Sequence, residues 1–204
     1  MQHKTEANIS TNTHIFLTER GNFCKRKGLQ LILLLLMLAF FAHPTFAKEL
    51  VWVDGMSNGF PAETCYEMMQ VLVNEFALSE EGAASVLGNV AQESMFNAHT
   101  PGYYYGICQW DPNYRWPQIS SWIINNGYST DSPVAQLRAI FGNGDDSNRA
   151  EGDAYTTILN HMKEVTSLDD GVSRFLYEYE GCGANLSERL TYAKTILAFW
   201  DANK

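Results

Sequence analysis

One stretch of the chain, 80-EEGAASVLGNVAQES-94, predicts an amphipathic helix. Val86 and Val90 recur at helical spacing, and Ser79 stands where a helix N-cap is expected. Glu93 follows Val90 by three residues and Val86 by seven, so it leans onto the apolar face in the last turn. The first question that this sequence raises is why a carboxylate occupies that face.

Three features disfavour the charged form of Glu93. Its helical neighbours are apolar, and the C-terminal end of a helix carries partial negative charge. No Lys or Arg occurs between Lys48 and Arg115. These features predict a carboxylic acid that keeps its proton near neutral pH, as the cleavage of a glycosidic bond requires. The residues alone leave an alternative open, in which Glu93 is partly exposed or ion-paired with a distant arginine such as Arg115.

The loop that follows, 102-GYYYGICQW-110, is rich in aromatic residues. Tyrosine and tryptophan offer flat faces with polar edges, and the Gln109 amide offers a donor and an acceptor to a hydroxyl or N-acetyl group. Gly102 and Gly106 permit a tight turn that brings backbone close to a ligand. The candidate substrate-binding residues are Ser94, Tyr103, Tyr104, Tyr105, Gln109 and Trp110. The alternative is that the tyrosines simply cover a core.

The beginning of the 204-residue chain has the layout of a secretory signal. A basic stretch, 25-KRKG-28, precedes the apolar run 31-LILLLLMLAFFA-42, and 43-HPTFA-47 offers a cleavage site after Ala47. The apolar run is short for a membrane span of ~20 residues, which disfavours the alternative of an uncleaved anchor. We therefore expect residues 1–47 to be a signal peptide with a long basic leader. Residues 48–204 would be a single domain, secreted or associated with the cell wall, without stable membrane association.

The predicted mature part is acidic. Residues 48–204 contain nine Lys and Arg against 21 Asp and Glu, which gives a net charge of −12. This balance argues against a nucleic-acid partner and gives no electrostatic steering toward an anionic polymer. Any sugar substrate must therefore be held by local contacts. We expect a monomer without a cofactor.

The cysteines and the polar loop 142–153 give no support for a metal site. Cys24 lies in the leader, and Cys65, Cys108 and Cys182 allow either one disulfide with one thiol or three thiols. None has the C-x-x-C spacing of a zinc site. The segment 142-GNGDDSNRAEGD-153 lacks the ligand pattern of an EF-hand, so a solvated loop is expected.

The remaining pattern is mostly helical. Candidate helices cover about 61–77, 112–123, 133–141, 153–164, 168–180 and 186–202, with capping signals at Ser132 and Ser167. No convincing alternation of apolar and polar residues occurs, so any sheet is expected to be one short hairpin around 102–110. The predicted fold class is mainly α, with at most a short β-hairpin near the cleft.

Two segments in this order, 87-LGNVAQESMFN-97 and 106-GICQW-110, resemble the phage tail lysozyme family of the lysozyme-like superfamily. The likeness continues in 134-VAQLRAIF-141, 172-VSRFLYEYEG-181 and 186-LSERLTYA-193, where that family has a Gln-Leu helix, an aromatic-Glu step and an Arg-containing helix. It covers about residues 64–200. The chain departs from the family pattern at Gly181, where Arg is frequent, and at Cys108, where a larger side chain is usual.

The resemblance implies a mostly helical lysozyme-like fold and a peptidoglycan substrate. The implied reaction is cleavage of the β-1,4 bond between N-acetylmuramic acid and N-acetylglucosamine in the glycan strand. The resemblance carries the catalytic acid onto Glu93, and the glycan-contacting segment onto Gln109 and Trp110.

A glycosidase of either stereochemistry needs a second carboxylate, as base or as nucleophile. The candidates are Asp111, Glu180 and Glu178. Asp111 precedes Pro112, a position that favours a helix cap over a catalytic role. Without a second carboxylate, the 6-hydroxyl of the sugar would close on the anomeric carbon, and the enzyme would be a lytic transglycosylase. The sequence leaves both outcomes open.

Two rival functions belong to other classes. A Cys-His hydrolase would use Cys108 with His99 or His161, but reactive thiols need an electropositive setting that this acidic chain does not provide. A non-catalytic wall-binding protein would have no need for a buried acid at Glu93. That residue therefore separates an enzyme from a binder.

Overall fold

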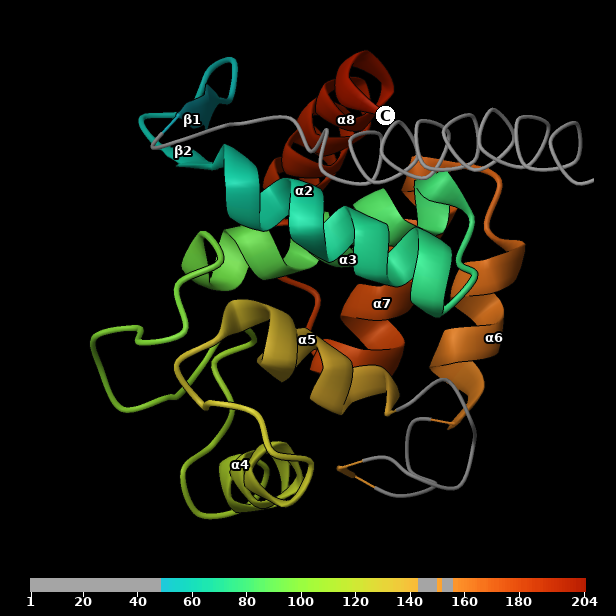
Figure 1. Ribbon diagram of the computed structural model, residues 1–204. Helices are drawn as coiled ribbons and strands as arrows, with labels where there is room; N and C mark the ends of the chain where they lie inside the picture. Colours follow the sequence, from blue (N-terminus) through green and yellow to red (C-terminus); the bar gives the residue numbers. More distant parts are fainter. Residues whose placement is uncertain (1–48, 143–149, 152–155) are drawn as a thin grey trace, which may run out of the picture. The chain divides into compact units, whose positions relative to one another are not determined.

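The computed structural model describes residues 49–142, 150–151 and 156–204 and is mainly helical (Figure 1). Two short strands pair antiparallel, with Val51 opposite Phe60. The elements in chain order are β1 (Leu50–Trp52), β2 (Gly59–Pro61), α2 (Ala62–Gln70), η1 (Val71–Glu75), α3 (Glu80–Ser94), α4 (Trp116–Asn125), α5 (Pro133–Phe141), α6 (Thr156–Glu164), α7 (Leu168–Phe175), η3 (Leu176–Glu180) and α8 (Leu186–Asn203). The segments η1 and η3 are single π-helical turns that continue α2 and α7.

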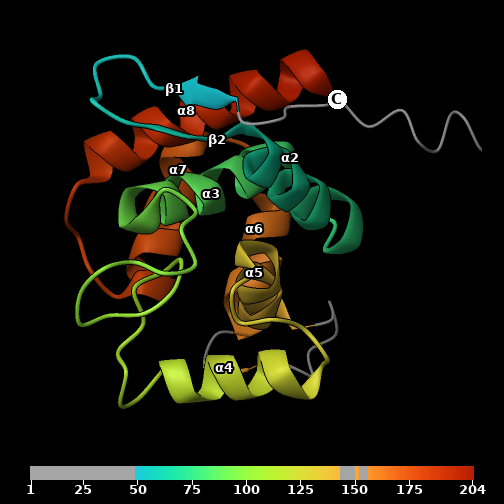
Figure 2. The same ribbon diagram turned by 60° about the vertical axis from the view of Figure 1, so that its left-hand side comes forward.

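Helix α3 is the centre of the fold. Every residue from Gly82 to Ala91 is buried, so the helix is enclosed all round along its middle. It packs against α8 and α7 most extensively and also contacts α2 and α6 (Figures 1 and 2). Ser79 caps its start, because the Ser79 hydroxyl accepts a hydrogen bond from the Gly82 amide at 2.9 Å. The same hydroxyl donates to the Val165 carbonyl at 2.6 Å, which ties α3 to the end of α6.

A glycine lets α8 lie directly on α3. A methyl group added at Gly88 would come within 2.6 Å of the Arg189 carbonyl oxygen and 2.7 Å of the Ala193 methyl. No other residue type fits there without moving the α8 backbone. This close approach places Arg189 beside the C-terminal half of α3.

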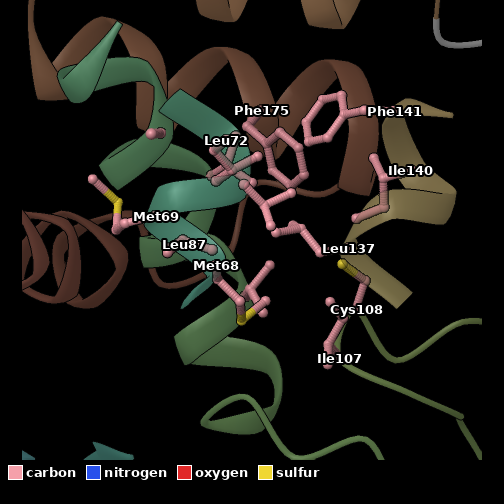
Figure 3. Packing of buried hydrophobic residues seen from close by; sticks show 14 of the residues in the cluster. Met68, Met69, Leu72, Leu87, Ile107, Cys108, Leu137, Ile140, Phe141 and Phe175 are labelled. Carbon is pink, nitrogen blue, oxygen red and sulfur yellow. The ribbon is translucent and has the colours of Figure 1, made fainter. Parts of the chain in front are cut away.

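The loop between α3 and α4 is anchored in the core at its inner end. Ile107 and Cys108 are buried next to Leu137 of α5 (Figure 3). The buried Gln136 amide accepts a hydrogen bond from the Ile107 amide at 2.8 Å and donates to the Thr130 carbonyl at 2.7 Å. The apolar anchor and the two hydrogen bonds of Gln136 fix the inner end of the loop against α5.

The predicted fold class is confirmed, and the caps expected at Ser79, Ser132 and Ser167 are present. The hairpin is misplaced: the sheet is β1 with β2, whereas the segment 102–110 contains an isolated bridge between Tyr105 and Trp110. Strands of three residues are too short to show alternation in a sequence. The reason for the error is therefore the length of the elements.

Some predictions fall outside the described residues. The leader and its cleavage site lie there, as does most of the polar loop 142–153. Glu151 of that loop is described, and only 8% of its side chain is exposed, so Glu151 itself is shielded from solvent. Across 49–142, 150–151 and 156–204, the helices are too short or too polar to cross a membrane.

Candidate functional site: a carboxyl pair at the end of α3

Glu93 lies in the last turn of α3, where 21% of its side chain is exposed. Its carboxylate accepts a hydrogen bond from the Arg189 Nη2, in an ion pair with a guanidinium that is 3% exposed. Arg189 also donates to the Asn89 carbonyl and side-chain oxygens at 3.3 and 3.2 Å, and to the Ala184 carbonyl at 3.1 Å. The guanidinium is therefore fully engaged between α3 and α8.

This ion pair contradicts the expectation of an unpaired acid at Glu93. The absence of a cation nearby in the sequence suggested isolation, but the counter-ion comes from a position 96 residues downstream. An opposite charge in contact stabilises the charged form of a carboxyl group. The alternative of an ion pair with a distant arginine is the correct one, with Arg189 in the place suggested for Arg115.

The carboxyl group whose pKa is raised is instead Glu180, at the end of η3, where its side chain is hydrogen-bonded to Cys108. Its Oε1 is buried and accepts no hydrogen bond from any described residue. Burial, followed by the negative charge of Glu93, raises the pKa of Glu180 from 4.5 to about 8, against the opposing charges of Arg115 and Arg189. Glu180 therefore keeps its proton at neutral pH beside a second carboxyl group that is ion-paired.

A π-helical turn gives η3 its shape. Tyr179 is 1% exposed and points into the core, while the next residue, Glu180, is half-buried. Gly181 then ends the turn in the left-handed region, with φ of 69°. Single π-helical turns are frequent at functional sites because they redirect side chains within a helix.

Gln109 supports Glu93 from the aromatic loop. Its side-chain Nε2 donates a short hydrogen bond to the Glu93 backbone carbonyl. Its own backbone is in the left-handed region, with φ of 50°, as are Met95 and Phe96 directly after α3. Non-glycine residues in this region are uncommon and concentrate at functional sites. The amide expected to contact a sugar is thus engaged in positioning the end of α3.

The three consecutive tyrosines are exposed, as a sugar-binding surface requires. Tyr103, Tyr104 and Tyr105 are 59%, 47% and 47% exposed. The Tyr105 ring stacks on Trp116 at 5.5 Å, and the Tyr103 hydroxyl accepts a hydrogen bond from Asn113 at 2.7 Å. Their faces are therefore held in place on the outside of the loop. Ser94 is less available, because its hydroxyl donates to the Val90 carbonyl of its own helix at 3.2 Å.

Trp110 does not offer its ring to a ligand, which corrects the expectation of a sugar contact. It is 1% exposed, because its indole lies in the core and donates to the Tyr179 hydroxyl at 3.0 Å. That hydroxyl donates to Glu151 at 3.0 Å, and Glu151 pairs with Arg115 at 2.6 Å. Trp110 thus belongs to a buried polar network that joins the loop to η3.

The other candidate carboxylates have structural partners. The Asp111 Oδ1 accepts from the Asn113 amide at 2.8 Å and so stabilises a turn ahead of α4. The helix cap expected at Asp111 is wrong, because α4 begins at Trp116 with Arg115 in the N-cap position. Glu178 is on the surface and lies 2.6 Å from His161 Nδ1, so the structure separates it from the site. Glu180 is therefore the candidate that remains beside Glu93, whose charge contributes to its raised pKa.

A Cys-His hydrolase finds no support. Cys108 is buried, and that burial raises its pKa well above 9, which leaves an unreactive thiol. His99 lies 3.1 Å from Asp131, and His161 is engaged by Glu178. Cys65, Cys108 and Cys182 are all free thiols. In the part of the chain that is described, no group of three His, Cys, Asp or Glu gathers as metal ligands would.

Several residues of the site were missed by the sequence analysis, above all Asn89, Gln136, Glu151 and Arg189. Asn89 and Gln136 are polar residues on otherwise apolar helix faces, and this pattern is a usable signal for buried hydrogen bonding. Glu151 and Arg189 gave no such signal, because their partners lie far away in the sequence.

Hollows of about 460 and 330 Å³ lie elsewhere on the molecule. The first is between α2 and α5 and the second between α7 and α8, and neither is lined by Glu93 or Glu180. The site at Glu93 and Glu180 is thus identified by the chemistry of its residues and not by the size of a cavity.

Comparison with known proteins identifies the family of the chain. The family model described as phage tail lysozyme matches residues 63–199. Neither a curated protein nor a solved structure matches the chain. The matched range contains both carboxyl groups, the aromatic loop and Arg189. The chain therefore belongs to the phage tail lysozyme family and has the helical fold and the glycosidase-type, peptidoglycan-directed character of a lysozyme-like enzyme.

Proposed function

We propose that the protein is a secreted muramidase that cleaves the β-1,4 bond between N-acetylmuramic acid and N-acetylglucosamine, with Glu93 as general acid. The observation that carries this proposal is the difference between two neighbouring carboxyl groups. Glu93 is partly exposed and ion-paired with Arg189, whereas Glu180, also half-buried, has one carboxyl oxygen that is buried without a hydrogen bond, and its pKa is raised to about 8. Two carboxyl groups whose environments separate their protonation states are the machinery that glycosidases use.

The position of Glu93 supports its role as the group that meets the glycosidic oxygen. Its carboxyl is exposed enough to reach a ligand, and Gln109 connects its backbone to the loop that carries the exposed tyrosines. A general acid must lie within hydrogen-bond reach of the oxygen that it protonates. Arg189 orients the carboxyl group through the ion pair.

The acidic protein does not attract an anionic glycan strand by its charge, so the exposed tyrosines would hold the sugar by local contacts. Tyrosine rings stack on the apolar faces of sugars, and their hydroxyl groups bond to sugar hydroxyls. Tyr103, Tyr104 and Tyr105 are each about half exposed, the first two with perpendicular rings and the third with one face stacked on Trp116. No cofactor is needed for this reaction, and the acidic net charge disfavours nucleic acid as a substrate.

A lytic transglycosylase is the second candidate, and one observation favours it. Glu180 is neutral at pH 7, so it is not available at the outset to activate a water molecule. Attack by the 6-hydroxyl of the sugar on the anomeric carbon requires less assistance from a base than attack by water. A wall-binding protein without turnover would have no use for the pair.

Digestion of purified peptidoglycan by protein exported from the full-length gene tests the proposal. Mass spectrometry of the released muropeptides distinguishes the outcomes. Reducing ends support the muramidase, anhydro ends support the transglycosylase, and the absence of release contradicts both. Glu93→Gln should abolish release, whereas Glu178→Gln removes a surface carboxylate two residues from Glu180 and should leave release unchanged.

A further inference from the structure

We propose that Asn89 is a positioning residue of the site, because its side-chain oxygen fixes the Arg189 guanidinium in the orientation from which it holds the Glu93 carboxyl group. This inference rests on the proposed cleavage reaction and deepens it. The hydrogen bonds of the Asn89 side chain go to Ser85, Val172 and Arg189, so Asn89 acts on Glu93 through Arg189.

Asn89 and Glu93 lie one turn apart on the same side of α3. Arg189 of α8 reaches both of them, since the lack of a side chain at Gly88 lets the α8 backbone come close. Asn89 is fully buried and Arg189 is 2% exposed, so solvent offers few alternative partners to either group. A buried charge has to be held by hydrogen bonds from the protein. The contacts between these side chains therefore decide where the guanidinium lies.

The Asn89 amide is held in one of its two possible orientations. Its Nδ2 donates to the Ser85 carbonyl at 2.9 Å and to the Val172 carbonyl at 3.3 Å. Its Oδ1 accepts from the Arg189 Nη1 at 3.2 Å. A rotation of the amide by half a turn would place its oxygen against two carbonyl oxygens and its donors against a guanidinium, so each of these hydrogen bonds would become a repulsive contact. The carbonyl groups of α3 and α7 thus aim the Asn89 oxygen at α8.

The Arg189 guanidinium is anchored on two sides before it meets Glu93. Its Nε donates to the Ala184 carbonyl at 3.1 Å, and its Nη1 donates to the Asn89 side-chain and backbone oxygens at 3.2 and 3.3 Å. A guanidinium group is planar, so these bonds fix the direction of the remaining Nη2, which donates to the Glu93 carboxylate. Without the Asn89 side-chain oxygen, two backbone carbonyls alone would hold the plane, and Nη2 could turn away from Glu93.

The same geometry separates turnover from substrate binding. The exposed tyrosines 103–105 lie on a loop whose inner end is bonded to Gln136, and Gln109 ties this loop to the Glu93 backbone carbonyl. These contacts are made without Asn89. Loss of the Asn89 oxygen should therefore lower kcat, which depends on the direction of the acid, and should leave KM close to that of the parent.

Steady-state cleavage of soluble glycan strands by the exported protein tests the inference. Asn89→Leu keeps the size of the side chain and removes its oxygen, so we expect kcat to fall by at least about tenfold while KM stays within about threefold. Asn89→Asp keeps an oxygen in the place of Oδ1, so its kcat should exceed that of Asn89→Leu by at least about threefold. Val86→Ala is the matched control, because it destabilises the buried part of the same helix without removing a hydrogen bond, and its kcat should stay within about threefold of the parent.

Thermal melts of the variants show how much stability each has lost. A kcat loss in Asn89→Leu no larger than that in Val86→Ala would mean that Asn89 serves the stability of the fold alone. An equal kcat loss in Asn89→Asp would mean that the Asn89 oxygen is not the group that matters. Either result overturns the inference. If the melts show that Asn89→Leu does not fold, Asn89→Ala takes its place in every comparison.

A second measurement does not depend on activity. Nitrogen-15 NMR of the parent should resolve separate Nη signals for Arg189, because its hydrogen bonds slow the rotation of the guanidinium; these signals are assigned by their absence from Arg189→Met. They should merge or broaden in Asn89→Leu and stay resolved in Val86→Ala. Resolved Arg189 signals in Asn89→Leu overturn the inference at any level of activity. If the signals merge as expected but the parent does not cleave peptidoglycan, the proposed function fails, whereas the orientation of Arg189 by Asn89 stands.

Discussion

Glu180→Gln should stabilise the protein at neutral pH and leave it unchanged in acid. The pKa of Glu180 is raised from 4.5 to about 8 by burial and by the charge of Glu93. Below pH 4.5 the carboxyl is protonated in both the folded and the unfolded chain, so it has no effect on the pH dependence of folding. Above 4.5 the unfolded chain releases the proton and the folded chain does not, so stability falls as pH rises until about 8, where the loss levels off.

The size of the effect follows from the same two values. Each pH unit between them removes about 1.4 kcal/mol, which gives a loss of ~3 kcal/mol at pH 7 and of ~5 kcal/mol above pH 8. Glutamine has the shape of the protonated acid and does not titrate. The free energy of unfolding of Glu180→Gln should therefore exceed that of the parent by these amounts, with no gap near pH 4. For a domain of this size, ~3 kcal/mol corresponds to roughly 6–12 °C in Tm.

Thermal and urea melts of both proteins between about pH 4 and pH 9 measure the gap directly. Glu178→Gln is the matched control, because it removes a carboxylate that lies on the surface beside His161. A constant gap between parent and Glu180→Gln across this range would refute the reasoning. So would a variant that is less stable than the parent at pH 7, since Glu180 would then be an ionised and well-paired group.

Four further predictions concern other groups of the site. Glu93→Gln should lower cleavage by at least ~10²-fold in a peptidoglycan assay, and a fully active variant would exclude Glu93 as the acid. Because the substitution deprives the buried Arg189 of its partner, it should also lower the free energy of unfolding by about 1–3 kcal/mol in urea melts. Arg189→Met should lower stability by about 3–5 kcal/mol, and an unchanged urea midpoint would show that the pair does not form. Tyr179→Phe should cost about 1–3 kcal/mol and change tryptophan fluorescence, because the Trp110 indole loses its acceptor; identical spectra and melts would contradict the network. N-terminal sequencing of the exported protein should give Lys48, and a full-length product retained in the membrane would argue for an anchor.

The features that were predictable from the sequence are those that depend on near neighbours. Ser79, Ser132 and Ser167 cap their helices through amides three residues ahead, so a short window of sequence contains both partners. The π-helical turns at η1 and η3 have no such local code, and β1 and β2 are too short to show alternation. The positions of most helices could therefore be anticipated, but not the π-helical turns, the start of α4 at Trp116 or the turn that carries Glu180.

The two carboxyl groups of the candidate site were predicted from the sequence, but the ion pairs and pKa shifts of these groups were not. Glu93 and Glu180 were both among the candidate carboxyl groups, yet the unpaired acid was assigned to the wrong one. A pKa depends on groups that are close in space, and Arg189 is 96 residues away from Glu93 along the chain. For the same reason Trp110 seemed available to a sugar, although Tyr179, 69 residues downstream, holds it in the core.

The contact of α8 with Gly88 has a consequence for the order of events during synthesis. The guanidinium of Arg189 bonds to Asn89, 100 residues earlier, so this contact closes one of the longest loops in the domain. Such contacts form late in folding, and a chain that emerges from its N-terminus has α3 long before it has α8. Until α8 docks, Glu93 lacks its counter-ion Arg189, and the side of α3 that carries Gly88 is uncovered. The proposed catalytic centre is therefore completed by the last helix, and we expect molecules that end before α8 to be inactive.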